Sequence, residues 1–158
     1  MADDFHVQEL FQQSNFEAVD RRRYPEVLEA GVAQNGMSTD EVLAVAHDVG
    51  LWAICRFGIF RADLRGMFKK RIEVDNLIPY SQIVSVGMEP SGPHTQQVVI
   101  HGSGARKLAQ INFSAAGPAR TIEGAAAHCA RIQQIAEGAR LQAHRPHATR
   151  ASADPAAP

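Results

Sequence analysis

The 158-residue chain has few cysteines, few aromatic residues, almost no net charge and no long apolar run. Its two cysteines, Cys55 and Cys129, are too few and too far apart for a disulfide framework. A net charge of −1 argues against a nucleic-acid partner, which would require a basic surface. No stretch approaches the ~20 apolar residues of a membrane-spanning helix, and residues 1–4 lack the features of a signal peptide. We therefore expect a cytoplasmic protein with reduced thiols and no transmembrane segment.

Motifs of metal binding and catalysis are also missing. The sequence contains neither a Cys-x-x-Cys nor a His-Glu-x-x-His motif, and its seven histidines are scattered. The segment Gly102-Ser103-Gly104 is not followed by the Gly-Lys-Ser/Thr of a phosphate-binding loop, so a turn is expected there. No serine lies in a nucleophile elbow, and no acid–base pair is evident. We expect a protein without catalytic residues, metal ion or cofactor.

The middle of the chain is a series of short apolar runs separated by turn-forming residues, a pattern typical of antiparallel strands. The expected strands are 51–57, 58–64, 72–74, 78–86, 98–100 and 108–113, with a hairpin tip at 65–71, a loop at 89–93 and a turn at 101–104. Residues 40–47 are ambiguous. The spacing of residues 38–41 fits a capping box at a helix start, whereas residues 42–46 are apolar on both faces. We favour a strand.

Helical patterns flank this region. Residues 3–35 are expected to be helical, with a break at Tyr24-Pro25 because the residue before proline avoids the helical conformation, and an end at Asn35-Gly36. Residues 118–142 carry an apolar stripe at helical spacing. Strands followed by one helix predict an α+β fold, a small antiparallel β-barrel or roll capped by a C-terminal helix with an N-terminal helical extension.

The composition divides the chain into three parts. We expect a helical extension at residues 1–37, a barrel domain at 38–143 and a tail at 144–158. The tail consists mostly of Ala, Pro, Arg, Ser, Thr and Asp, which offer too little apolar surface to offset the entropy of ordering, so disorder is expected there. The extension carries much apolar surface. The sequence leaves open whether it covers a sheet face in the same chain or docks on another chain.

The segment 40–139 resembles the bacterial pleckstrin-homology-like (PH-like) domains. The resemblance rests on the apolar strand pair at 51–60, the pattern Ile78-Pro79-Tyr80-x-x-Ile83-x-x-Val86 and the terminal helix. It departs from the family at residues 55–58, where many members carry a Thr-Asp-Arg-type turn. The resemblance implies two nearly orthogonal sheets capped at one end by the helix. It also implies binding or self-assembly and no chemistry, and bacterial members tend to oligomerise.

The candidate binding site is the basic hairpin tip. Its residues are Arg61, Arg65, Met67, Phe68, Lys69, Lys70 and Arg71. As a membrane contact, each cation near an anionic leaflet would contribute about 1 kcal/mol, and the Met-Phe pair would insert at the headgroup level. The alternatives are a solvated turn or a Met-Phe pair packed on the N-terminal helices.

These observations support three hypotheses about function. The first is a non-catalytic binding or adaptor module of PH-like type that self-associates and docks a protein partner. The second is a peripheral binder of anionic lipids that uses the basic 65–71 loop. The third is a small-molecule-binding enzyme in the barrel mouth, which is disfavoured because small barrels fill their interior with side chains.

Overall fold

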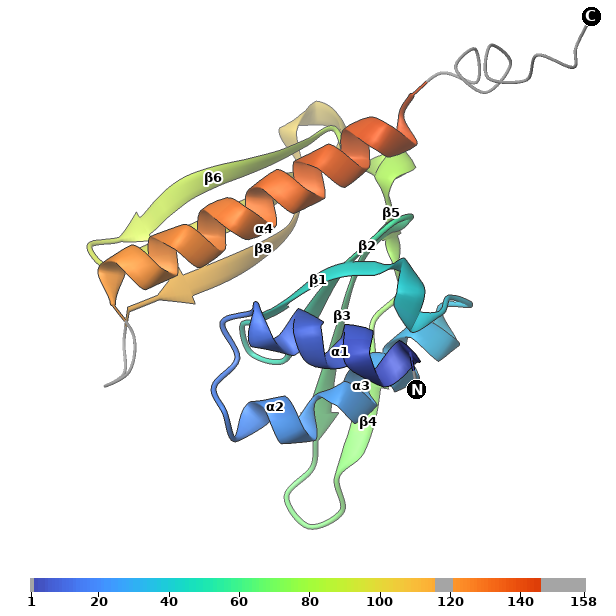
Figure 1. Cartoon of the computed structure of the whole chain (residues 1–158). Helices are drawn as coiled ribbons and strands as arrows, with labels where there is room; N and C mark the ends of the chain where they lie inside the picture. Colours follow the sequence, from blue (N-terminus) through green and yellow to red (C-terminus); the bar gives the residue numbers. More distant parts are fainter. Residues whose placement is uncertain (1, 116–120, 146–158) are drawn as a thin grey trace, which may run out of the picture.

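The computed structural model describes residues 2–115 and 121–145 (Figure 1). It is an α+β fold made of two antiparallel sheets, three N-terminal helices and one long C-terminal helix, as the sequence predicts at this level. The expected start of the last helix at residue 118 and most of the disordered tail expected at 144–158 lie outside the described residues. The tail prediction is wrong at its first residue, because His144 caps the end of the last helix.

The first sheet is a meander of hairpins. Its strands follow one another in space in the order β1 (Val42–His47), β2 (Leu51–Cys55), β3 (Gly58–Arg65) and β4 (Arg71–Val74), all antiparallel. The short strand β5 (Ile78–Pro79) pairs with the beginning of β3. The strand prediction for residues 42–46 is confirmed. The predicted capping box of residues 38–41 is present as well. It caps a short 3₁₀ turn just before β1 and not an α-helix.

The second sheet contains β6 (Ser85–Gly92), β7 (Thr95–His101) and β8 (Lys107–Ser114), again in sequential antiparallel order. The predicted hairpin around residues 101–104 is confirmed. The predicted loop at 89–93 is wrong, since β6 continues through Pro90 to Gly92. Proline is tolerated there because β6 is an edge strand. A backbone nitrogen on the side away from β7 donates no hydrogen bond to the sheet, so its missing hydrogen costs nothing.

The two sheets do not join into a barrel. Within residues 2–115 and 121–145 no backbone ladder links a strand of one sheet to a strand of the other, so the expected closed barrel is not formed. The predicted strand at 78–86 is also wrong in part. After β5 the chain turns through a 3₁₀ segment, Tyr80–Gln82, before β6 begins. The Tyr80 hydroxyl donates a hydrogen bond of 2.5 Å to the Cys55 carbonyl and fixes this turn against the first sheet.

The N-terminal helices cover the outer face of the first sheet (Figure 1). They are α1 (Ala2–Gln12), α2 (Asp20–Arg23) and α3 (Pro25–Gln34). Pro25 stands in the first turn of α3, so a new helix does begin there as predicted. The stated reason is wrong, because Tyr24 keeps helical dihedral angles, with φ of −88° and ψ of −16°. The expected helix at 3–35 is also wrong at residues 13–19, which connect α1 to α2 without helical structure. Buried apolar residues of α1 and α3 share one core with β1, β2 and β3, which answers the question left open by the sequence: the extension packs in cis.

Because it is covered on both sides, the first sheet has no solvent face at its centre. Along β2, Leu51 and Ala53 face the helices, whereas Ile54 faces the second core, which lies between the sheets and the last helix. Strands buried on both faces are apolar at nearly every position, so their sequences lack the alternation of a half-buried strand. This double burial explains why residues 42–46 are ambiguous by periodicity.

The last helix, α4 (Ile122–Ala143), lies along the second sheet and reaches the first (Figure 1). Cys129, Ile132 and Ala136 of the predicted stripe are buried against both sheets. The Thr121 hydroxyl accepts a hydrogen bond of 2.9 Å from the Gly124 N–H and caps the start of the helix. At the other end the His144 ring contacts the Tyr80 carbonyl at 2.7 Å.

Candidate functional site

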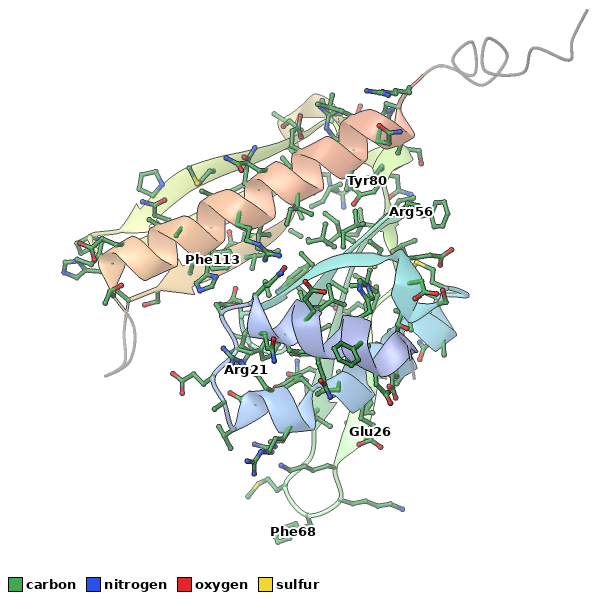
Figure 2. The ribbon with its side chains drawn as sticks, in the orientation of Figure 1. Arg21, Glu26, Arg56, Phe68, Tyr80 and Phe113 are labelled. Atoms are coloured by element: carbon green, nitrogen blue, oxygen red, sulfur yellow. The ribbon has the colours of Figure 1, made fainter. Side chains whose placement is uncertain are left out.

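The candidate site lies at the turn of the β3–β4 hairpin. In the antiparallel register of the two strands, Arg65 of β3 stands opposite Arg71 of β4. Residues 66–70 are the connecting loop, so the predicted hairpin is confirmed. Gly66 has a φ of +104°, and a Cβ there would come within 2.4 Å of the Lys69 carbonyl oxygen. The turn therefore requires glycine. In Figure 2 the loop projects beyond the helices, with Phe68 at its end.

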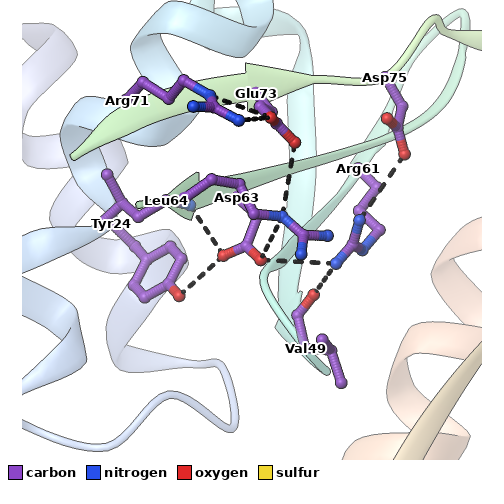
Figure 3. A network of polar contacts seen from close by, with 9 residues as sticks. Tyr24, Val49, Arg61, Asp63, Leu64, Arg71, Glu73 and Asp75 are labelled. Carbon is purple, nitrogen blue, oxygen red and sulfur yellow. Dashed lines mark hydrogen bonds and ion pairs between the residues drawn. The ribbon is translucent and has the colours of Figure 1, made fainter. Parts of the chain in front are cut away.

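The arginines of the predicted site do not lie at the tip. They stand on the strands, where ion pairs with neighbouring carboxylates hold them (Figure 3). Arg61 lies 3.6 Å from a carboxylate oxygen of Asp63 and 3.8 Å from one of Asp75. It also donates a hydrogen bond to the Val49 carbonyl in the β1–β2 turn. Arg61 is thereby engaged in joining two hairpins of the first sheet.

The other two arginines are engaged in the same way. Arg65 lies 3.6 Å from Asp63 and 3.5 Å from Glu73, and Arg71 lies 3.0 Å from Glu73. Three carboxylates therefore balance three guanidinium groups, and the strands below the tip carry no net charge from these six residues. The sequence indicated the cations but not this pairing, because Asp63, Glu73 and Asp75 come together only when β3 pairs with β4.

A hydrogen bond ties this network to the N-terminal helices. The Tyr24 hydroxyl donates to Asp63 at 3.3 Å, and the Leu64 N–H donates to the same carboxylate oxygen at 2.8 Å. Partial burial, and then the charge of Asp63, raise the pKa of Tyr24 above its ordinary value. The phenol therefore stays protonated and remains a donor at neutral pH. The base of the hairpin is fixed to the body of the protein, while its tip is not.

What remains at the tip is two apolar side chains and two cations. Met67 is 90% exposed and Phe68 is 100% exposed. Lys69 and Lys70 are exposed as well, and neither forms an ion pair with any residue that the structure describes. The alternative in which the Met-Phe pair packs on the N-terminal helices is therefore wrong. We call residues 67–70 the hairpin tip.

Both cysteine side chains are buried. Burial raises the pKa of the Cys55 thiol to about 12 and that of Cys129 to about 11, so both are protonated at neutral pH. Within the described ranges, no group of three or more His, Cys, Asp or Glu side chains is placed to hold a metal ion. No helix in the described part of the chain is both long and apolar enough to cross a bilayer.

The structure also contains a cavity of about 550 Å³ that the sequence does not indicate. Three segments far apart in sequence form its walls: the α1–α2 connection, the end of β8 and the first turns of α4. Residues from these segments that line it include Phe16, Val19, Arg21, Phe113, Ala125 and His128. No local pattern could have revealed the cavity, because it exists only where the N-terminal extension meets the second sheet and α4.

Comparison with known proteins adds no identity. No family model matches the chain, and no curated protein or solved structure matches it with significant similarity.

Proposed function

We propose that the protein is a non-catalytic binding module of the cytoplasm that docks a protein partner through the hairpin tip. The observation that carries this proposal is the complete exposure of Phe68, beside Met67, at the end of a braced hairpin. Aromatic residues and methionine are enriched at the cores of protein interfaces. A few well-buried residues of an interface carry most of its binding energy. A hairpin that holds such a pair in water gains stability when a partner buries it.

The pairing of the arginines favours a protein over a lipid surface. Attraction to an anionic membrane depends on the number of available cations, at about 1 kcal/mol each. Five basic residues surround the tip in sequence, but carboxylates neutralise three of them, which leaves Lys69 and Lys70. Two lysines and one apolar pair fall short of the two strong signals of stable membrane anchoring.

A PH-like classification supports the same role and stays a proposal. Two antiparallel sheets with a C-terminal helix have the general layout of that family, whereas the open arrangement of the sheets departs from the barrel. Proteins of one fold serve many functions, so the fold supports a binding role without naming the partner.

Site-specific photo-crosslinking tests the proposal. A photoreactive phenylalanine analogue at position 68 is expected to crosslink a defined protein in cells of the native host. The same analogue at position 57, a 54% exposed phenylalanine in the β2–β3 turn, is the matched control and is expected to give no such product. The captured protein must then bind the purified chain and lose binding to Phe68→Asp. Equal crosslinking from both positions would refute docking at the tip.

Lipid binding is a second candidate because Lys69 and Lys70 stand directly beside the exposed Phe68. Co-sedimentation with vesicles rich in anionic lipids, at low and high salt, tests it. If lipid is the ligand, replacing both lysines with alanine is expected to weaken binding about 30-fold, since about 1 kcal/mol is lost per cation. The matched control replaces the exposed Arg22 and Arg23 of α2. Absence of vesicle binding at low salt removes this candidate.

A further inference from the structure

We infer that the hairpin tip docks into an apolar pocket of another protein, and that the rim of this pocket carries carboxylates that pair with Lys69 and Lys70. This inference rests on the proposed docking role and adds the chemistry of the partner. It follows from the distribution of charge along the hairpin. The arginines at its base have carboxylate partners, whereas the lysines at its tip have none in the part of the chain that the structure describes.

The hairpin tip has an apolar part and a cationic part, which follow one another along the loop. Met67 and Phe68 come first, after β3, and both side chains are almost entirely exposed. Lys69 and Lys70 come next and lead into β4. A purely apolar pocket would bury the Met-Phe pair and leave two ammonium groups at its edge, where each requires water or an anion. Carboxylates are therefore expected on the part of the rim that faces β4.

The chain supplies no anion of its own to the two lysines. Glu73, the first carboxylate after them in the sequence, lies 3.0 Å from Arg71 and 3.5 Å from Arg65. Neither lysine forms an ion pair with any described residue. An unpaired surface cation keeps its attraction for an approaching anion, so an acidic rim makes the docked surfaces electrostatically complementary.

The kind of free cation favours carboxylates over phosphates. Arginine is the residue best suited to phosphate, because its planar guanidinium donates two parallel hydrogen bonds. The arginines of this hairpin already donate to carboxylates: Nε and Nη2 of Arg71 both donate to one oxygen of Glu73, at 3.1 and 3.0 Å. The free cations are lysines, which act as point charges without this geometry. An acidic protein is thus a better match than a nucleic acid or a lipid surface.

The base of the hairpin is ordered before any partner arrives. The Arg65 guanidinium of β3 and the Glu73 carboxylate of β4 join the two strands directly below the tip. Gly66, with its positive φ, sets the direction in which the loop leaves β3. A hairpin that is already ordered loses less conformational entropy on binding than a flexible loop does, which favours affinity. The Met-Phe pair and the lysines therefore reach the partner as one unit.

The two parts of the tip are expected to respond differently to salt. Burial of the apolar pair gives a contribution that salt does not screen. The attraction of the lysines acts mainly on the association rate, and it weakens as the screening length falls from about 10 Å at 0.1 M salt to about 3 Å at 1 M. Docking is therefore expected to weaken as salt is added and to depend on Phe68 at every salt concentration.

The first experiment identifies the groups that lie beside the lysines. Lipid-depleted extract of the native host is the probe, and the photoreactive phenylalanine analogue at position 68 marks the docked protein. A water-soluble carbodiimide then condenses amines with carboxylates in direct contact and takes up the released water as a urea. Mass spectrometry of the marked protein is expected to find amide bonds from Lys69 or Lys70 to its Asp or Glu side chains. Lys107, the third lysine of the chain, is exposed at the start of β8 and is expected to give none.

The second experiment changes the charge of the tip and keeps the photoreactive group at position 68. Replacing both tip lysines with glutamate is expected to lower the yield of the photoproduct about tenfold, since two exposed ion pairs are lost and repulsion replaces them. Replacing both with arginine keeps the charges and is expected to retain docking. Lys107→Glu is the matched control and is expected to leave the yield unchanged. Circular dichroism shows whether each variant is folded.

The outcomes separate this inference from the docking role. A photoproduct whose yield is the same with lysines or glutamates at positions 69 and 70 overturns the acidic rim and leaves the docking role standing. Absence of amide bonds from Lys69 and Lys70, or equal coupling from Lys107, has the same consequence. Absence of any photoproduct from position 68 refutes the docking role itself, and this inference with it.

Discussion

The Val86 N–H donates a hydrogen bond of 3.1 Å to the Glu137 carboxylate, which joins the edge strand β6 to α4. One helical turn earlier, the Gln133 amide donates to the Val86 carbonyl at 2.8 Å. Both backbone groups that β6 turns away from β7 at this residue are therefore satisfied by the helix. Arg140 holds the Glu137 carboxylate at 2.9 Å. In this way α4 takes the place of a neighbouring strand and protects the edge of the second sheet.

Removing this contact is expected to destabilise the protein. Glu137→Ala leaves a part-buried N–H without its acceptor, so the free energy of unfolding should fall by about 1–3 kcal/mol. Urea denaturation followed by the fluorescence of Trp52, the single tryptophan, measures the change. Gln134→Ala, on the exposed face of the same helix, is the control and should change stability little. Equal effects of the two variants would contradict this account of β6.

The Glu137 carboxylate also makes the free energy of unfolding depend on pH. The hydrogen bond from Arg140 is the main reason that the pKa of Glu137 lies below its ordinary value. A lowered pKa means that the folded state favours the ionised form, so this contribution is complete above about pH 4.3, the value in an unfolded chain. It is lost as the pH falls through the folded value. The acid-induced loss of stability should be smaller in Glu137→Gln, and identical acid profiles would refute the assignment.

Two glycines within helices are expected to respond to alanine in opposite directions. A Cβ on Gly31 of α3 would lie 2.3 Å from the Phe60 ring of β3, so Gly31→Ala should destabilise the protein by about 1–3 kcal/mol through overpacking. A Cβ on Gly138 of α4 would meet nothing within 4 Å. Gly138→Ala should therefore stabilise by about 0.5–1 kcal/mol through helix propensity. Thermal unfolding measures both, and stabilisation by Gly31→Ala would show that α3 does not pack closely on the sheet.

The buried thiol of Cys55 predicts a loss of stability at alkaline pH. Burial raises its pKa from about 9 to about 12, so folding favours the protonated thiol. A raised pKa means that this contribution is complete below about pH 9 and is lost progressively between pH 9 and 12. Comparing denaturation midpoints at several pH values in this range should give a shallower decline for Cys55→Ala. Parallel declines in the two proteins would contradict the burial of this side chain.

Local signals in the sequence predicted some element boundaries but not the end of α1 at Gln12. Pro25 predicts the start of α3, and Gly36, with φ of +69°, ends it. The apolar runs at 51–64 predict a strand pair because their length and turn residues are typical of strands. The loop predicted at residues 89–93, partly from Pro90, is wrong because β6 runs through this proline. Whether proline disrupts a strand depends on the side of the strand that its nitrogen faces, which the sequence does not encode locally.

The candidate site was predictable only in part, for a related reason. The sequence placed Lys69 and Lys70 at a hairpin tip beside Met67-Phe68, and the structure keeps them there. It could not show that Arg61, Arg65 and Arg71 are paired, because strand register brings their carboxylates beside them. The prediction of a closed barrel is wrong because no backbone ladder joins the two sheets in the described residues, and the chain passes between them through the 3₁₀ turn held by Tyr80. Contacts that depend on tertiary structure decided each of these cases.

Methyl NMR of the protein labelled with ¹³C at its methionines tests the central claim most directly. Met67 is 90% exposed at the hairpin tip, and Met88 is 48% exposed on β6 and serves as the internal control. In lipid-depleted extract of the native host, the Met67 signal is expected to broaden or shift while the Met88 signal stays unchanged. Phe68→Asp should abolish the change. A Met67 signal that stays sharp and unshifted in the extract would contradict docking of a protein at the tip.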